Sequence, residues 1–225
     1  MKKTIHRAET RGYADHGWLR THHTFSFAGY YDPTRVHFGA LRVLNDDTVA
    51  PGEGFGTHPH DNMEIVSIVL SGALKHGDSM GHMKVLEPGD IQVMSAGTGI
   101  THSEMNASRD EPVQFLQIWV LTDADNHTPR YNQVELLPGK RNELRLIVGP
   151  EGHGSEHVGW IHQKAWFYTL GLDAGRELEY RMNLHGNGAY VFVVEGRAEV
   201  AGEELGPRDG MGIEAADDFR IKASQ

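Results

Sequence analysis

A segment in the first half of the chain returns in a similar form in the second half. Residues 69–72 (VLSG) are followed by residues 86–91 (LEPGDI), and residues 194–196 (VEG) are followed by residues 205–211 (LGPRDGM). Each copy has the order strand, glycine turn, strand, proline turn, strand. The repeat therefore predicts a duplicated β-barrel unit whose second copy has diverged.

Apolar or alternating runs elsewhere in the chain are typical of further short strands, and turn residues separate many of them. The stretch 123–131 is polar, contains Pro129 and interrupts this pattern. We therefore predict an all-β fold with one domain over residues 1–130 and a second over residues 131–225. The predicted strands cover residues 38–44, 63–70, 90–94, 114–121, 144–148, 166–172 and 190–194.

The composition argues against several classes of function. The formal net charge is −10 and no basic run is present, which opposes direct binding to nucleic-acid phosphates. No apolar stretch is long enough to predict a membrane span, and the polar residues 4–9 behind Lys2 and Lys3 do not resemble an export signal. We expect a cytoplasmic protein. Because the chain has no cysteine, any metal must be held by nitrogen and oxygen.

Two short motifs in the first half predict a metal site. His58-Pro59-His60 and His102-Ser103-Glu104 each place two polar side chains at i and i+2, on one face of a strand. Three imidazoles and a carboxylate could then bind one divalent ion and leave positions open for a substrate. The alternative is that such pairs arise by chance among 15 histidines. Two pairs in glycine-flanked, strand-like segments favour the metal.

The second half has no such pair. We expect its histidines, His153, His157, His162 and His185, to be surface or structural residues.

The histidine motifs resemble the two cupin motifs, with small departures. The residues that match are Gly52, His58, His60 and Glu64 in the first motif and Gly99, His102 and Asn106 in the second. Gly72 comes one position late, Gly89 comes two positions early, and Gly97 replaces the usual proline. Longer stretches, notably residues 54–60, 89–100, 102–104 and 117–120, resemble the pirin family of bicupins.

This resemblance implies two stacked jelly-roll-type barrels, with one metal in the first barrel and iron, as Fe(II), as the usual ion. Mn, Ni, Co, Cu and Zn are alternatives. Many cupins use the glutamate of the first motif as a ligand, here Glu64, whereas pirins use the one two residues after the third histidine, here Glu104. We predict His58, His60, His102 and Glu104 as ligands, because the i+2 spacing already places Glu104 beside His102. Glu64 then either accepts a ligand imidazole N–H or pairs locally.

Bacterial pirins are associated with flavonol 2,3-dioxygenase chemistry. The resemblance therefore implies cleavage of quercetin or a related enolisable aromatic compound by O2, with Glu104 as the catalytic base. An alternative is a metal- or redox-sensing regulator that acts through a protein partner, which an acidic surface would suit. A third is a structural metal in an inert barrel.

Overall fold

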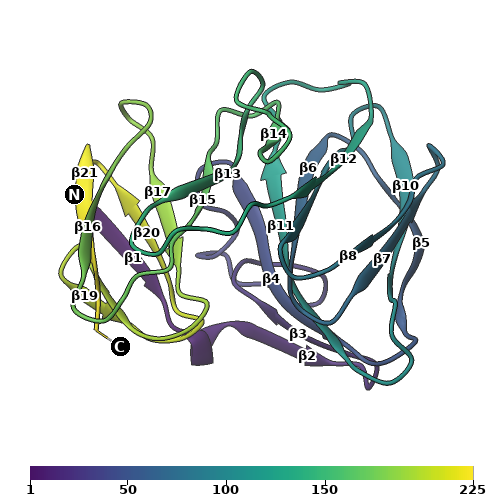
Figure 1. The fold of residues 1–225 in the computed structure, drawn as a ribbon, viewed down its shortest axis with the longest axis horizontal. Coiled ribbons are helices and arrows are strands. Elements are labelled where there is room, and N and C mark those ends of the chain that lie inside the picture. The colour runs from purple at the N-terminus through teal and green to yellow at the C-terminus, as the bar shows by residue number, and fades with distance from the viewer. Residues whose placement is uncertain (225) are drawn as a thin grey trace. The chain divides into compact units, whose positions relative to one another are not determined.

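The computed structural model describes residues 1–224, whose regular secondary structure is β-strand apart from one 3-10 helix, η1 (Ala8–Thr10) (Figure 1). The all-β prediction is confirmed. None of the helical structure in these residues is long and apolar enough to cross a membrane. The chain forms two compact units. The larger unit contains residues 12–138 and 146–167, and the smaller unit contains residues 1–11, 139–145 and the chain from residue 168 onward.

The larger unit contains two main antiparallel sheets. The four-stranded sheet has the order β5 (Gly54–His60), β10 (Ile100–Asn106), β7 (Leu74–Asp78) and β8 (Met83–Leu86). The seven-stranded sheet has the order β12 (Arg130–Glu135), β9 (Asp90–Ser95), β6 (Met63–Ser71), β11 (Val113–Leu121), β4 (Leu41–Val49), β3 (Leu19–His23) and β2 (Gly12–Asp15). The short strands β13 (Arg145–Pro150) and β14 (Gly159–Ile161) pair in parallel.

The two sheets of the larger unit pack face to face. Leu74 and Leu86 of the four-stranded sheet are fully buried against Val69 and Phe115 of the seven-stranded sheet. A second apolar cluster, around Ile65 and its neighbours Met94, Ala96 and Ile100, is also fully or almost fully buried. Alternation along the strands explains this arrangement, because every second side chain faces the opposite sheet. These buried residues identify the inner face of each sheet.

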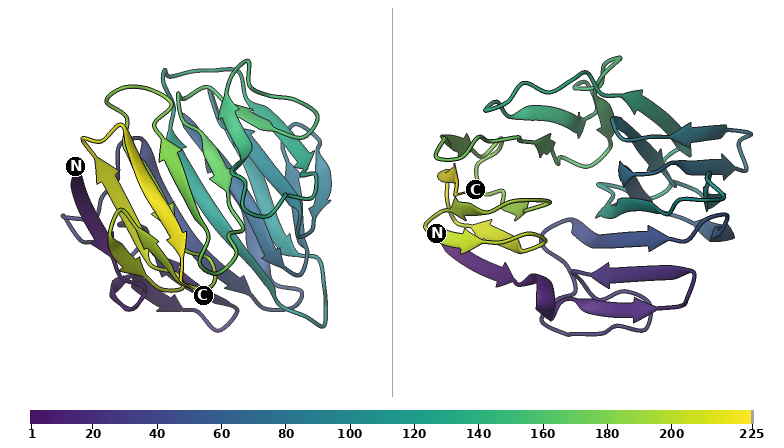
Figure 2. Two further views of the ribbon diagram at one scale, coloured as in Figure 1. Left: turned by 60° about the vertical axis from the view of Figure 1, so that its left-hand side comes forward. Right: turned by 60° about the horizontal axis from the view of Figure 1, so that its bottom comes forward.

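The smaller unit is built from two further sheets. Their orders are β1 (Lys2–His6), β20 (Gly210–Glu214) and β17 (Ala189–Phe192), and β16 (Glu177–Arg181), β21 (Asp218–Ala223), β18 (Ala198–Val200) and β19 (Glu203–Leu205). The strand β15 (Phe167–Thr169) leads into this unit. Figure 2 shows the N-terminal strand β1 beside β20, with which it pairs in register from Lys2 to His6. The interior is apolar and includes Met211, Ile213 and Phe219.

Each of the seven predicted strands overlaps an observed one, but the first was placed too early. The observed strand begins at Leu41, because residues 38–41 form an isolated bridge around Gly39, which has a φ of 54°. The units also interleave along the chain, since residues 1–11 belong to the smaller unit. A single domain boundary at residue 130 therefore stays a prediction.

Candidate metal centre

The three predicted histidine ligands lie on two neighbouring strands. His102 of β10 is paired directly with His58 of β5, and Ile100 is paired with His60. Paired residues on adjacent strands project from the same face of the sheet. The i, i+2 spacing of His58 and His60 places both on the face from which His102 projects. Strand register therefore brings the three imidazoles together.

Pro59 lies on the edge strand of the sheet, where the lack of a backbone N–H leaves no ladder hydrogen bond unmade. The edge of a sheet is where a proline within a strand is tolerated. The edge position also keeps the flanking histidines at the margin of the sheet, where both are only half-buried.

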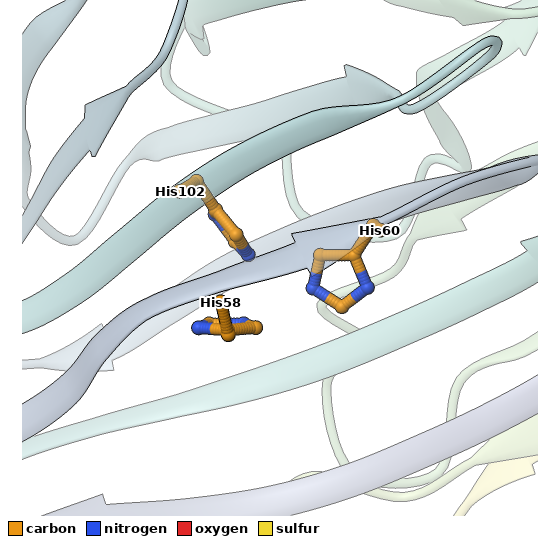
Figure 3. Close-up of side chains that lie close together, drawn as sticks. All are labelled: His58, His60 and His102. Carbon is orange, nitrogen blue, oxygen red and sulfur yellow. The ribbon is translucent and has the colours of Figure 1, made fainter.

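The imidazoles form a compact cluster. One nitrogen from each of His58, His60 and His102 lies within 4.8 Å of those from the other two, and no other group of this kind occurs in residues 1–224. The ring centroids are 4.5 to 4.9 Å apart. Figure 3 shows the three rings turned toward a common region from their two strands. This geometry suits a single metal ion.

A backbone carbonyl selects the nitrogen that His58 offers. The Nδ1 atom of His58 lies 2.7 Å from the carbonyl oxygen of Gly56. A carbonyl only accepts, so Nδ1 carries the hydrogen and the lone pair of Nε2 is free for a metal. The register between β5 and β10 shifts between His102 and Glu104, which leaves one extra residue on β5 beside Gly56. This β-bulge permits the close approach of the carbonyl to the ring.

The environment of His60 and His102 favours the neutral form of these two rings. Burial, followed by the neighbouring His102 and His58, lowers the pKa of His60 to about 4. Burial also lowers the pKa of His102 to about 3, with smaller contributions from His58 and His76. Neutral imidazoles are the form that binds metal.

A second observation, independent of the distances between the rings, supports a metal ion at the cluster. Both ring nitrogens of His102 are buried and have no hydrogen-bond partner, although the residue is only 1% exposed. A buried polar group without a partner is costly, and an ion at the cluster would provide a partner for one of these two nitrogens.

The predicted fourth ligand, Glu104, is buried in the interior of the larger unit and is 2% exposed. Its carboxylate accepts hydrogen bonds from Ser67, Gln92 and Gln117. The group of donor atoms within 4.8 Å of one another comprises the histidines and does not include Glu104. Glu104 is near enough to raise the pKa of His60 by its charge, against the larger effect of burial. Its role as a ligand stays a prediction.

Glu64 takes the local alternative. Its carboxylate accepts hydrogen bonds from the Ser95 hydroxyl at 2.6 Å and from the backbone N–H of His162 at 3.1 Å. Glu64 lies three residues from Ser67 on β6, so the two side chains point to opposite faces. Ser67 contacts Glu104 on the inner face. The outer position of Glu64 therefore points away from the histidine cluster.

Aromatic residues flank the cluster. The ring of Trp119 is edge-on to His60, with centroids 4.9 Å apart, and Phe27 packs edge-on to Trp119. The ring centroid of Phe55 lies 6.4 Å from that of His58, and Phe55 packs edge-on to Trp18. Apolar walls with a few polar groups are typical of small-molecule sites. Phe55 and Trp119 are therefore candidates for the walls of a pocket beside the cluster.

Sequence reasoning missed a second polar group beside the cluster. His76, on β7, is fully buried, lies opposite Glu104 in the strand register and has its ring 5.5 Å from that of His102. Its Nε2 atom lies 3.0 Å from the Asp78 carboxylate, which also contacts His82. The residues 76–78 read His-Gly-Asp, and their even spacing on a strand was the only available signal.

The histidines of the second half lie elsewhere. His162 stacks on His127 with centroids 3.7 Å apart, and His153 packs edge-on to Trp166. The Nδ1 atom of His157 contacts the carbonyl of Glu135, and that of His185 contacts Asp217.

The fold and the cluster together define a bicupin protein with a candidate metal site in its larger unit. A family model described as pirin matches residues 4–120, and one described as quercetinase C-terminal cupin domain matches residues 146–225. A relative from Escherichia coli K12 named quercetin 2,3-dioxygenase is 41% identical over 215 residues, which cover 93% of this chain and 88% of the relative. The chain belongs to the pirin family.

Solved structures agree with this assignment. The crystal structure of YhhW from Escherichia coli has a TM-score of 0.95 and 37% identity, covering 100% of this chain and 94% of that one. A structure of bacterial pirin YhhW in complex with nickel(II) has a TM-score of 0.93 at the same identity, covering 100% of this chain and 95% of that one.

A relative from Mycobacterium tuberculosis named putative quercetin 2,3-dioxygenase is 52% identical over 132 residues, 59% of this chain and 54% of the relative.

Proposed function

We propose that the protein is a metal-dependent dioxygenase that cleaves quercetin or a related flavonol with O2. The observation that carries the proposal is the cluster of His58, His60 and His102, whose ring nitrogens converge in the same unit as a buried carboxylate, Glu104. The names of the relatives from Escherichia coli and Mycobacterium tuberculosis support the substrate class. An enolisable aromatic compound would also suit the aromatic walls around the cluster.

The protein's own residues divide the work. The three imidazoles would hold the ion, and Glu104 would be its fourth ligand and would take the proton of the substrate hydroxyl. A divalent metal bound there would act as a Lewis acid toward that hydroxyl. Trp119 beside His60 and Phe55 beside His58 would orient a planar substrate and exclude water.

We propose Fe(II) as the working ion. Imidazole nitrogens with one carboxylate oxygen suit first-row divalent metals, and the recovered ion depends on availability as well as on the ligands. The nickel(II) complex of YhhW fits this view that the site type accepts several ions. Mn, Co, Cu and Zn remain alternatives for comparison.

The direct test is oxygen uptake by the full chain after anaerobic loading with Fe(II). We expect consumption of O2 with quercetin. At saturating metal, Glu104→Gln should retain bound ion through the histidines and lose turnover, because the amide is not a base. Full activity in this variant would remove the proposed base.

The absence of turnover with iron, manganese, nickel, cobalt and copper would reject the enzyme for this substrate. A change in exposed apolar surface between Fe(II) and Fe(III), together with that absence, would favour the regulatory alternative with a protein partner.

Two further expectations, a domain boundary near residue 130 and a cytoplasmic location, are also proposals. Limited proteolysis and cell fractionation test them.

A further inference from the structure

A row of polar side chains crosses the inner face of the seven-stranded sheet in the larger unit. Each member is paired in register with the next on the neighbouring strand, so all of them project to the same side. The members in order are Gln133, Gln92, Ser67, Gln117, Asn45 and His23. We call them the polar row.

The polar row lies where an apolar core is expected. The adjacent pairs on the same inner face, Ile65 with Met94 and Val69 with Phe115, are almost completely buried. Gln92 and Ser67 are themselves fully buried. Burying amides and hydroxyls costs free energy unless they are hydrogen-bonded, so packing alone does not account for them. A polar partner must lie above the row.

That partner is Glu104, which reaches across from β10 in the opposite sheet. Gln117 Nε2 donates to Glu104 Oε2 at 2.6 Å, and Gln92 Nε2 donates to Oε1 at 3.0 Å. The Ser67 hydroxyl, which has a single hydrogen, lies 3.1 Å both from Oε1 and from the Gln117 side-chain oxygen. Both carboxylate oxygens are thus held by neutral donors from three different strands.

We propose that Gln117, Ser67 and Gln92 are positioning residues that hold the Glu104 carboxylate beside the three histidines and thereby set how tightly the site binds a divalent metal. The inference rests on the proposed role of Glu104 as fourth ligand. The strand spacing places Glu104 next to His102, but a glutamate has three rotatable side-chain bonds. Three donors on a rigid sheet fix its orientation before an ion arrives and reduce the entropy lost on binding.

The test measures nickel(II) binding to the metal-free full chain by competition with a chelator. Gln117→Met removes the shortest hydrogen bond to Glu104 while keeping the length of the side chain. We expect the dissociation constant for nickel to rise by about 10- to 100-fold. Gln114→Met is the matched control, because Gln114 lies on the same strand and its amide donates to Asp46. The control should leave the constant unchanged.

A double-mutant cycle separates positioning from a general loss of structure. In a Glu104→Ala background, which already weakens binding, Gln117→Met should have no further effect. The absorption spectrum of bound Co(II), which reports coordination geometry, should change in Gln117→Met and stay unchanged in Gln114→Met. Gln92→Met provides a second probe of the same carboxylate should Gln117→Met fold poorly.

An unchanged nickel constant in both Gln117→Met and Gln92→Met would overturn the positioning role alone. An equal loss with and without Glu104 would overturn it as well, because the effect would then not act through the carboxylate. An unchanged constant in Glu104→Ala would overturn the ligand assignment together with this inference. All three results are independent of quercetin turnover, which tests the proposed reaction separately.

Discussion

At the scale of single residues, burial shifts the pKa of individual side chains in the larger unit, and Asp47 is the clearest case. Asp47 lies on β4 among the inward-facing residues, is 3% exposed, and has an oxygen, Oδ1, without a partner. Burial raises the pKa of Asp47 to about 7, a hydrogen bond from Thr21 opposes the rise, and the charges of Glu104 and Asp46 add to it. Burial likewise lowers the pKa of His60 and of His102. A polar interior of this kind suits a metal site. A buried carboxyl such as Asp47 also lowers the free energy of unfolding when it is charged.

The stability of the protein should therefore depend on pH through Asp47. In the unfolded chain this carboxyl loses its proton near its ordinary value of 3.8, whereas the folded chain keeps it to about 7. The contribution is fully present below pH 4 and falls as the pH rises through 7. We expect Asp47→Asn to gain stability relative to wild type between pH 4 and 8, by on the order of 4 kcal/mol. Urea unfolding of the metal-free protein measures this difference, and a constant difference across the range would contradict it.

The residues of the site differ in how well the sequence predicts them. His58, His60 and His102 are recognisable because a strand places i and i+2 on one face, and this rule needs no tertiary information. Gln92 and Gln117 carry no motif, since they meet at Glu104 only through the pairing of separate strands. The hydrogen bonds of Glu64 likewise depend on the backbone N–H of His162, which follows β14 almost a hundred residues later. Such contacts require the register of the sheets.

At the scale of elements, the contact between β5 and β10 aligns the histidines with Glu104. The bulge shifts the pairing, so that Glu104 lies opposite Phe55 and Met105 opposite Gly54. A Cβ atom added at Gly54 would lie 2.4 Å from the Glu104 carbonyl oxygen and 2.5 Å from Met105 Cα. Both are backbone atoms, which cannot move aside as a flexible side chain would. Glycine is therefore required at this position by the close approach of the strands.

Gly54→Ala should separate the two strands and destabilise the protein by about 1–3 kcal/mol. Gly56→Ala is the control, because an added Cβ there meets no atom within 4 Å and the strand is the same. Urea denaturation of both metal-free variants gives the comparison. Equal stability of the two would show that the strands tolerate the added methyl group.

The repeat and the turn residues were sufficient to predict strand-rich copies, but they did not identify every strand. The strand β1 (Lys2–His6) begins the chain with two lysines and carries no alternation that distinguishes it from a loop. It becomes a strand because β20 offers it a pairing edge. Tertiary pairing thus overrides a weak local preference.

At the scale of the whole molecule, the N-terminal residues complete the smaller unit. Lys2 pairs with Glu214, and Asp209 accepts hydrogen bonds from the Arg7 guanidinium and the backbone N–H of Ala8. Ile5 packs against the apolar cluster of that unit. The smaller unit therefore contains segments from both ends of the chain, while the histidine cluster lies in the larger unit.

Deletion of residues 1–8 should expose β20 and the apolar cluster of the smaller unit. We expect limited proteolysis to cut residues 170–224 faster in the truncated chain than in the full chain. The reason is that an edge strand and its packing are lost. Cleavage within residues 12–138 should be unchanged. A proteolytic pattern identical to that of the full chain would contradict this role of the N-terminal segment.

The central claim is that His58, His60 and His102 together bind one metal ion. The most direct measurement is the metal content per chain after loading with Fe(II) or nickel(II) and removal of free ions, for the wild type, His102→Ala and the control His153→Ala. The account predicts one ion per chain in the wild type and the control, and a content near zero in His102→Ala. Equal metal content in all three proteins would contradict it.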